Sequence, residues 1–334
     1  MRKEFLLSVV VPMYNEESVA EVCYQRLLDV MNHNGYNFEL LFIDDGSQDG
    51  TMAILEQIAS DNKNVKIVDF SRNFGHQTAV TCGIQLACGD AVVIIDADLQ
   101  DPPEQIARMV KLWQEGYDVV YGKRNQRSGE TWFKLVTAKC FYRFLSAMSD
   151  VDIPVDTGDF RLIDRKVADV FSTMQEKNRF IRGMIAWVGF KQTFIEYDRD
   201  KRFAGETKYP LKKMLKFAAD GIFSFSSKPL KLMSTLGFIT IFVALLLIVY
   251  SLVQKIIGRA TITGWTSLMV AITFFSGVQL LSFGILGEYI ARIYDENKQR
   301  PLYIIKNKYN FHDSNFPGIE PSHRLRVHIG KDKG

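Results

Sequence analysis

Residues 92–104, VVIIDADLQDPPE, join an apolar run directly to a group of acidic residues and a double proline. The run Val92–Ile95 has no polar and apolar alternation, which is typical of a strand buried on both faces of a parallel sheet. Asp96 and Asp98 would then emerge at its carboxyl end, where open α/β sheets bind ligands. A surface turn rich in Asp and Pro would give the same letters. This stretch alone therefore leaves a metal or phosphate site and an ordinary turn equally open.

The first half of the chain alternates between apolar runs and helical stretches. Strands are expected at Ser8–Val11, Phe38–Ile43, Val65–Phe70, Ala91–Ile95 and Val119–Tyr121. Helices are expected between them, near residues 16–33, 50–61, 75–88 and 103–114. This alternation predicts an α/β fold with a mostly parallel, doubly wound sheet.

The second half contains two long segments without a charged residue, at 232–254 and 260–287. A helix of about 20 apolar residues is enough to cross a bilayer. Two buried core helices are the alternative, but soluble helices rarely run so far without a charged face. We therefore predict transmembrane helices at 232–254 and 265–287, joined by a short external loop at 255–264.

The charges that flank these segments predict their orientation. Lysines and arginines are frequent before the first span and after the second, whereas the connecting loop has only Lys255 and Arg259. The positive-inside rule therefore places the first domain and both termini on the cytoplasmic side of a multi-pass cell membrane protein. Residues 208–231 mix lysines with phenylalanines and could lie as amphipathic helices on the anionic inner leaflet, although a soluble helix pair is the alternative.

Composition adds limits on the class of protein. The chain has 334 residues and a net charge of +3, which is too small to argue for nucleic acid as a partner. Its four cysteines form no C-x-x-C pair, and we interpret them as reduced thiols facing the cytosol. The first 11 residues resemble a signal peptide, but Pro12 and the acids that follow favour a first core strand. The polar tail from about His312 is expected to be poorly ordered.

A second acidic group, Asp44 and Asp45 in IDDGSQDGT, follows the second predicted strand. Acids at this position can bind ribose hydroxyls, although an Asp-Gly turn explains the same letters. Neither the G-x-G-x-x-G nor the G-x-x-x-x-G-K-[ST] pattern occurs in the chain. Hydride transfer and P-loop hydrolysis are therefore disfavoured.

Six motifs in order resemble the GT-A fold, family 2 glycosyltransferases, which use nucleotide-sugar donors. They are VVVPMYNEE, IDDGSQDGT, SRNFGHQTAV, DADLQDPPE, TGDFRLIDRKV and RFAGETKYPLKKM, and with the two spans they cover residues 8–300. Within the family the chain is most similar to the polyprenyl-phosphate glycosyltransferases, which include bactoprenol glucosyltransferases and dolichol-phosphate mannosyltransferase. The resemblance implies a GT-A domain at 1–207 and a cytoplasmic tail at 288–334.

The resemblance also implies a donor site. Its expected residues are Pro12, Tyr14, Asn15, Glu16, Asp44, Asp45, Arg72, Asp96, Ala97 and Asp98. Asp96, Asp98 and Gln100 would hold a divalent metal at the donor diphosphate, and oxygen ligands of this kind suit Mg²⁺ or Mn²⁺. Such a metal would stabilise the departing nucleoside diphosphate as a Lewis acid. His76 in SRNFGHQ is expected either to support the donor site or to have a structural role.

The implied acceptor is a lipid phosphate, whose oxygen is largely anionic at neutral pH and hardly needs a strong base. Asp159 matches the position usually proposed as base, and orienting the acceptor or stabilising positive charge would serve as well. A helix-capping role is the alternative for Asp159. Cations expected at the acceptor phosphate are Arg124, Lys134, Arg202 and Lys208, and we expect Arg202 and Lys208 to contribute to catalysis with Asp98 and Asp159. Glu206 stands where many relatives have Ser and is left without a role.

The predicted function is the inverting transfer of one hexose, glucose from UDP-glucose, to undecaprenyl phosphate at the cytoplasmic face. Transfer of N-acetylglucosamine or mannose to the same lipid is an alternative. A processive polysaccharide synthase would carry Q-x-x-R-W and more spans, and QEKNRF at 175–180 does not match that motif. A non-catalytic scaffold that binds nucleotide sugar is disfavoured by the intact acidic group. Self-association is expected, with the Gly284 and Gly287 face available for helix packing.

Overall fold

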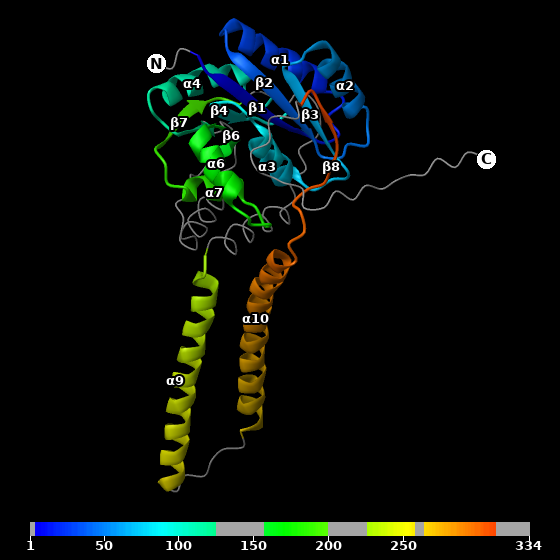
Figure 1. Cartoon of the computed structure of the whole chain (residues 1–334). Coiled ribbons are helices and arrows are strands. Elements are labelled where there is room, and N and C mark those ends of the chain that lie inside the picture. The colour runs from blue at the N-terminus through cyan, green and yellow to red at the C-terminus, as the bar shows by residue number, and fades with distance from the viewer. Residues whose placement is uncertain (1–3, 125–156, 200–225, 258–263, 312–334) are drawn as a thin grey trace, which may run out of the picture.

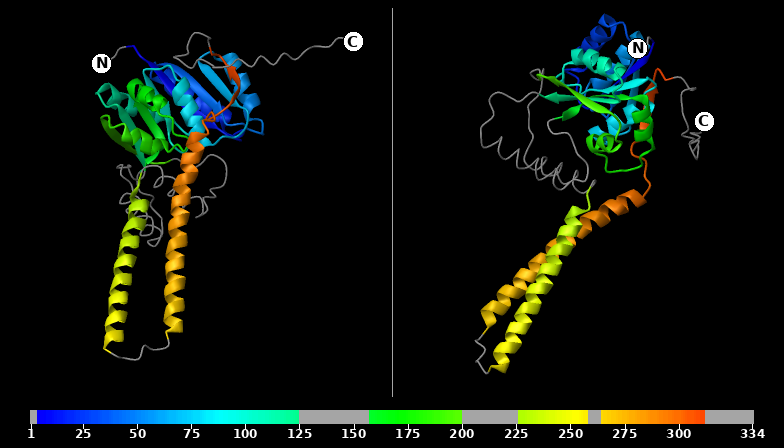
Figure 2. Two further views of the ribbon diagram at one scale, coloured as in Figure 1. Left: turned by 60° about the horizontal axis from the view of Figure 1, so that its bottom comes forward. Right: turned by 90° about the vertical axis from the view of Figure 1, so that its left-hand side faces the viewer.

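A computed structural model describes the chain at residues 4–124, 157–199, 226–257 and 264–311. These residues form an α/β domain from which two long helices extend on one side (Figure 1). The views in Figure 2 agree that both helices leave the same side of the domain. The predicted fold class, an α/β domain followed by two long apolar helices, is confirmed. The juxtamembrane helices expected at 208–231 lie mostly outside the described residues.

Four predicted parallel strands form the centre of the sheet. They are β1 (Leu6–Met13), β2 (Asn37–Asp44), β3 (Val65–Phe70) and β4 (Ala91–Ile94). The strand order is β7-β5-β6-β4-β1-β2-β3-β8, and Val10 of β1 is opposite both Leu41 of β2 and Ile94 of β4. Because β1, β2 and β4 are parallel, the residues that follow them meet at one edge of the sheet, called here the carboxyl edge.

The outer strands make the sheet mixed. β5 (Val119–Arg124) is parallel to β7 (Gln192–Tyr197), β6 (Thr157–Asp164) is antiparallel to both β4 and β5, and β8 (Ile305–Tyr309) is antiparallel to β3. The sequence reasoning predicted β5 and missed β6, β7 and β8. Since Ile94 of β4 pairs with Arg161 of β6, the first residues of β6 lie at the carboxyl edge. This antiparallel pairing is what brings Asp159 to the acids that follow β4.

Helices cover both faces of the sheet. One face packs against α1 (Ala20–His33), α2 (Thr51–Asp61) and α4 (Ile106–Gln114). A short 3-10 helix, η1 (Pro103–Gln105), comes directly before α4. The other face packs against α3 (His76–Leu86), α6 (Arg165–Thr173) and α7 (Ile181–Trp187). Val9 and Val11 belong to the first core and Val10 to the second, as strand alternation requires. A Cβ on Gly83 would lie 2.1 Å from Cγ1 of Val10, so α3 packs tightly on the central strand.

The helix α1 begins at Ala20, later than the expected start near residue 16. Asn15 has a φ of 55°, which interrupts the backbone between strand and helix. The carbonyl of Glu16 then accepts hydrogen bonds from the amides of Val19 and Ala20, both at 2.9 Å. Residues 14–19 therefore form a loop at the carboxyl edge.

The helices α9 (Lys228–Ile256) and α10 (Trp265–Asn297) are long and apolar enough to cross a membrane, by length and composition. Large apolar side chains on both are exposed, such as Phe238 (73%) and Leu280 (71%). This much exposed apolar surface indicates anchoring in a membrane. The predicted spans lie inside the two helices, and their topology stays a prediction. α10 continues to Asn297 as a charged helix, with Arg292 paired to Glu288 at 3.1 Å.

The chain that follows α10 returns to the sheet. The ring of Tyr303 stacks on Phe70 with centroids 5.1 Å apart, and the carbonyl of Ile304 accepts a hydrogen bond from the amide of Ser71 at 3.0 Å. β8 then pairs with β3, as Figure 1 shows. Because Ser71 directly follows β3, the carboxyl edge lies on the side of the domain where α10 ends.

Candidate active site at the carboxyl edge of the sheet

The loops after β1 and β2 are tied to each other. Asn15 accepts a hydrogen bond from the amide of Gln48 at 2.8 Å, and its own amide donates to the hydroxyl of Ser47 at 2.9 Å. Asp44 in turn accepts a hydrogen bond from the amide of Ser47 at 3.0 Å. Tyr14 is 43% exposed beside them. Three of the predicted donor residues, Tyr14, Asn15 and Glu16, therefore lie in the loop after β1, while Pro12 and Asp44 lie at the ends of β1 and β2 beside it.

Asp45 holds the loop between β3 and α3. Its carboxylate accepts hydrogen bonds from the amides of Phe74 at 2.6 Å and Gly75 at 2.9 Å. Burial raises the pKa of Asp45, and the two amides partly offset that rise. Gly46 has a φ of 71°, and a Cβ there would lie 2.4 Å from the backbone of Arg72. Asp45 and Gly46 thus fix the position of residue 76, which comes directly after this loop.

Arg72 stays close to the same loop. Its guanidinium lies 3.9 Å from the ring centroid of Phe74 and donates a hydrogen bond to the carbonyl of Asn73 at 2.8 Å. The Arg72 side chain is stacked on Phe74 but remains exposed to solvent, so binding a phosphate would not require it to break a buried ion pair. The predicted support of the donor site by Arg72 is compatible with this position.

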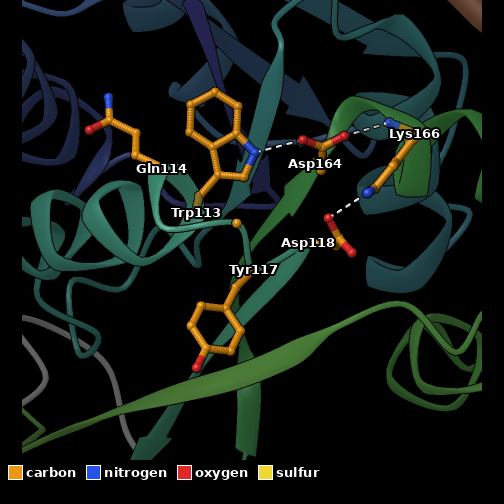
Figure 3. A pocket seen from close by; sticks show the side chains of 7 residues that line it. Trp113, Gln114, Tyr117, Asp118, Asp164 and Lys166 are labelled. Atoms are coloured by element: carbon orange, nitrogen blue, oxygen red, sulfur yellow. Dashed lines mark hydrogen bonds and ion pairs between the residues drawn. The ribbon is translucent and has the colours of Figure 1, made fainter. Parts of the chain in front are cut away.

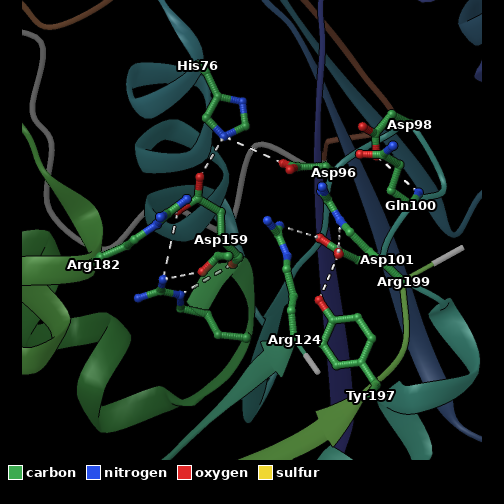
Figure 4. A network of polar contacts seen from close by, with 12 residues as sticks. His76, Asp96, Asp98, Gln100, Asp101, Arg124, Asp159, Arg182, Tyr197 and Arg199 are labelled. Carbon is green, nitrogen blue, oxygen red and sulfur yellow. Dashed lines mark hydrogen bonds and ion pairs between the residues drawn. The ribbon is translucent and has the colours of Figure 1, made fainter. Parts of the chain in front are cut away.

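His76 begins α3 and lies between two carboxylates. Its Nε2 atom is 3.3 Å from Oδ2 of Asp159 and 3.6 Å from Oδ1 of Asp96 (Figure 4). Burial opposes the charged form, but the hydrogen bond to Asp159 and the charges of both carboxylates outweigh it and raise the pKa of His76 to about 9. His76 is therefore a cation at neutral pH and links the loop after β3 to the loop after β4 and to the first residues of β6.

Asp159 is surrounded by cations. Its Oδ1 accepts a hydrogen bond from Nε of Arg182 at 2.8 Å and lies 3.8 Å from Arg161. Burial alone would raise the pKa of Asp159, but Arg182 and His76 together hold it well below its usual range. A carboxylate with such a low pKa accepts a proton poorly. Asp159 can order these cations and stabilise positive charge, and the arrangement argues against proton removal as its main role.

Asp96 follows the buried end of β4 and presents an unsatisfied oxygen. Its Oδ1 atom is buried and has no hydrogen-bond partner, since His76 at 3.6 Å is too far. Burial raises the pKa of Asp96 to about 6, although the charge of His76 opposes the rise. A buried carboxylate oxygen that makes no hydrogen bond within the protein is one to which a water molecule or an ion can bind.

Asp98 and Gln100 lie further along the same loop, and Figure 4 shows them beside each other and apart from Asp96. Oδ1 of Asp98 accepts a hydrogen bond from the amide of Gln100 at 3.1 Å, while Leu99 between them has a φ of 56°. Within the described ranges no three His, Cys, Asp or Glu side chains form a metal cluster. The metal role of Asp96, Asp98 and Gln100 therefore stays a prediction, and it would require substrate phosphates to complete the coordination, as they do for Mg²⁺ in many proteins.

A second polar cluster surrounds Asp101, which is fully buried. Its carboxylate accepts hydrogen bonds from the hydroxyl of Tyr197 at 2.7 Å, from Nε of Arg199 at 3.0 Å and from Arg124 at 3.4 Å. Arg124, a predicted acceptor-phosphate residue, is thus paired with a protein carboxylate, and its contact with a phosphate stays a prediction. Lys134, Arg202, Glu206 and Lys208 lie outside the described residues.

Sequence reasoning missed several of these partners. The missed residues are Asp101, Arg161, Arg182, Tyr197 and Arg199. Arg182 lies in RFIRGM without a recognisable pattern, and Arg161 lies inside TGDFRLID, where it reads as a surface residue of a strand. For Asp101 the sequence offered one signal: it is the third acidic residue after β4, following Asp96 and Asp98.

A cavity of about 270 Å³ lies at the opposite edge of the sheet, lined in part by Trp113, Asp118, Asp164 and Lys166 (Figure 3). Its polar groups are paired, because Trp113 donates to Asp164 at 2.7 Å and Lys166 pairs with Asp118 at 2.6 Å. The cavity is separate from the acids of the carboxyl edge, and we assign the chemistry to the carboxyl edge.

Comparison with known proteins agrees with this geometry. Residues 8–171 match the model of glycosyl transferase family 2, and residues 228–293 match the GtrB C-terminal hairpin. The chain is 56% identical to the uncharacterized glycosyltransferase YkcC of Bacillus subtilis, over 92% of this chain and 96% of that protein. It is 39% identical to the bactoprenol glucosyl transferase of Shigella phage SfV, over 90% of this chain and 98% of that one.

Among solved structures, the chain is similar to a glucosyl-3-phosphoglycerate synthase of Mycobacterium tuberculosis in complex with Mn²⁺, UDP-glucose and phosphoglyceric acid. The identity is 20%, the match covers 66% of this chain and 78% of the other, and the TM-score is 0.40.

Proposed function

The chain belongs to glycosyl transferase family 2, and from this premise we propose that it transfers one hexose from UDP-glucose to undecaprenyl phosphate at the cytoplasmic face of a membrane. Relatives named bactoprenol glucosyl transferase match about nine tenths of the chain. The transfer inverts the anomeric carbon, as the resemblance to this family implies. The observation that carries the proposal is the cluster of His76, Asp96 and Asp159 at the carboxyl edge, on the side of the domain where α10 ends.

The donor is held by the loops after β1, β2 and β3. Asp44 and Asp45 offer carboxylates for the nucleoside, and the interlocked hydrogen bonds around them keep the loops in place before the donor arrives. Asp96 and Asp98, with Gln100, would hold Mg²⁺ or Mn²⁺, which as a Lewis acid would stabilise the charge that develops on the departing diphosphate. Among the described residues, Oδ1 of Asp96 makes no hydrogen bond and has only the charge of His76 at 3.6 Å, which supports this assignment.

The acceptor is already anionic, so the protein has to attract and orient it. His76 and Arg182 carry positive charge beside Asp159, and Asp159 keeps both side chains in fixed positions. An anionic oxygen approaching this cluster needs no proton removed, which agrees with the low pKa of Asp159. We therefore assign Asp159 an organising and electrostatic role in the transfer.

Release of UDP tests the proposal. Purified protein with UDP-glucose, Mg²⁺ and undecaprenyl phosphate should release UDP, and omission of the lipid should stop the release. Asp98→Ala should abolish the activity, whereas Asp61→Ala, at the exposed end of α2, should leave it unchanged. Unchanged release from Asp98→Ala would remove the metal assignment. Donor binding without turnover, with every lipid phosphate tried, would favour a non-catalytic scaffold instead.

A further inference from the structure

Residues 174–182, which comprise the connection from α6 to α7 and the first two residues of α7, join α10 to the catalytic cluster. Near the start of this segment, the amide of Lys177 donates a hydrogen bond to Oε1 of Glu296 at 2.7 Å. At its end, the amide of Ile181 donates to Gln77 at 3.0 Å, and Nε of Arg182 donates to Asp159 at 2.8 Å. One short segment therefore contacts both the last turn of α10 and the residues beside His76.

This segment is internally braced. Nε of Arg179 donates a hydrogen bond to the carbonyl of Glu176 at 3.0 Å, and its guanidinium lies 5.2 Å from the ring centroid of Phe171 in α6. The carbonyl of Met174 accepts a further hydrogen bond from Arg179. These contacts close residues 174–179 on themselves, and we expect a shift at Lys177 to move the braced segment as a unit toward Arg182.

Glu296 lies where the membrane anchor meets the domain. It is half-buried in the last turn of α10, and its carboxylate accepts a backbone amide, which makes a charge-assisted hydrogen bond. Independent contacts hold the domain to the chain after α10, namely the stacking of Tyr303 on Phe70 and the pairing of β8 with β3. Loss of the Glu296 contact should therefore leave the fold intact.

We propose that Glu296 is a positioning residue: by holding the amide of Lys177 it fixes residues 174–182, and so sets Arg182 against Asp159. The consequence is that the geometry of the catalytic cluster depends on the anchoring helix. This inference rests on the proposed glycosyl transfer for its kinetic readout, but its structural readout does not.

Kinetics of three variants in the full-length protein test the role of Glu296. Glu296→Ala should lower kcat between about ten-fold and a hundred-fold through misplacement of the cluster, with the KM for UDP-glucose unchanged. Glu296→Gln keeps an oxygen that accepts the Lys177 amide and should retain activity within about three-fold. Asp295→Ala is the matched control, because Asp295 neighbours Glu296 in α10 and pairs with Lys298, the residue that caps the helix, at 2.9 Å. Equal kcat values for Glu296→Ala and the wild type would overturn the proposal, as would a Gln variant as impaired as the Ala variant.

Hydrogen exchange measured by mass spectrometry on the detergent-solubilised protein gives the readout that does not need activity. Glu296→Ala should speed amide exchange in peptides that cover residues 174–182 and leave peptides from β1 and β8 unchanged. Unchanged exchange at 174–182, or faster exchange throughout the domain, would contradict a local positioning role. If the wild type releases no UDP from any donor, the proposed function fails, and this exchange pattern still decides the role of Glu296.

Discussion

Replacing Arg182 with alanine should reduce turnover about a hundred-fold. The Nε atom of Arg182 lies 2.8 Å from Oδ1 of Asp159, and two unit charges at that distance attract by about 6 kcal/mol at an effective dielectric constant near 20. Desolvation offsets part of this attraction, and measured couplings of close charge pairs span about 1.5–7 kcal/mol. With 26% of the Arg182 side chain and 12% of the Asp159 side chain exposed, we expect a coupling of about 3 kcal/mol. A coupling of that size, lost from the transition state and not from the ground state, corresponds to about a hundred-fold in rate.

A double-mutant cycle measures this coupling. The cycle compares kcat for UDP release in the wild type, Arg182→Ala, Asp159→Asn and the double variant. In the Asp159→Asn background, loss of Arg182 should change kcat by less than about three-fold, because the partner that Arg182 holds is no longer charged. Arg26→Ala is the matched control: Arg26 pairs with Glu104 at 2.7 Å on an exposed part of the domain and should leave kcat unchanged. If the two single effects simply multiply, Arg182 does not act through Asp159.

Three further predictions test the surrounding structure. Gly46→Ala would bring a Cβ to within 2.4 Å of the backbone of Arg72, so the loop must move, and calorimetry should show UDP-glucose binding weakened by about ten-fold. In protein with Cys140 replaced by serine, maleimide at neutral pH should label Cys88, which is exposed, and spare Cys23, because burial raises the pKa of the Cys23 thiol to about 12. Mass spectrometry that showed Cys23 labelled before Cys88 would contradict the fold. Asn310→Ala removes hydrogen bonds to the backbone carbonyls of Ala59 and Val65, at 2.7 and 2.8 Å, and thermal unfolding should show that the free energy of unfolding falls by about 1–2 kcal/mol. An unchanged melting temperature would refute the role of Asn310 in holding β8.

The central strands of the sheet could be predicted because most of them are marked by the residues of their own short segments of sequence. The runs Val9–Val11, Leu40–Ile43 and Val92–Ile95 are continuous and apolar, so each identifies a strand covered on both faces. In β3 the apolar residues are interrupted by Lys66 and Asp69, and the strand was expected from its place in the alternation of strands and helices. The acids that follow β2 and β4 were expected at one edge because parallel strands end there together. The two long apolar helices were equally clear, since few soluble helices lack charge over such a length.

The outer strands were not predictable, because their pairing is set by distant parts of the chain. β8, with the sequence IKNKY, is a short edge strand with alternating lysines, and only its packing on β3 after the return from α10 makes it a strand. β6 was recognised as a motif and not as a strand. Its antiparallel direction, which carries Asp159 to the end of β4, follows from the topology of the whole domain.

The acidic residues of the site other than Asp101 were therefore predicted from the sequence, and most of their cationic partners were not. Asp96, Asp98 and Asp159 lie in motifs with turn residues, whereas Arg182 begins a short helix and Arg161 is buried in a strand. A buried arginine reads as a surface residue in sequence because its burial depends on a carboxylate brought from elsewhere. His76 was noted in its motif, but its position between two carboxylates appears only once α3 is placed on the sheet.

The mass of the lipid product tests the central claim most directly. Purified protein is incubated with undecaprenyl phosphate, Mg²⁺ and an equimolar mixture of UDP-glucose, UDP-N-acetylglucosamine and GDP-mannose, and the extracted lipid is analysed by mass spectrometry. We expect the lipid phosphate to gain a single hexose, isotope-labelled UDP-glucose to be its source, and Asp98→Ala to yield none. A ladder of several sugars on the lipid, or unmodified lipid recovered while UDP accumulates, would contradict this claim.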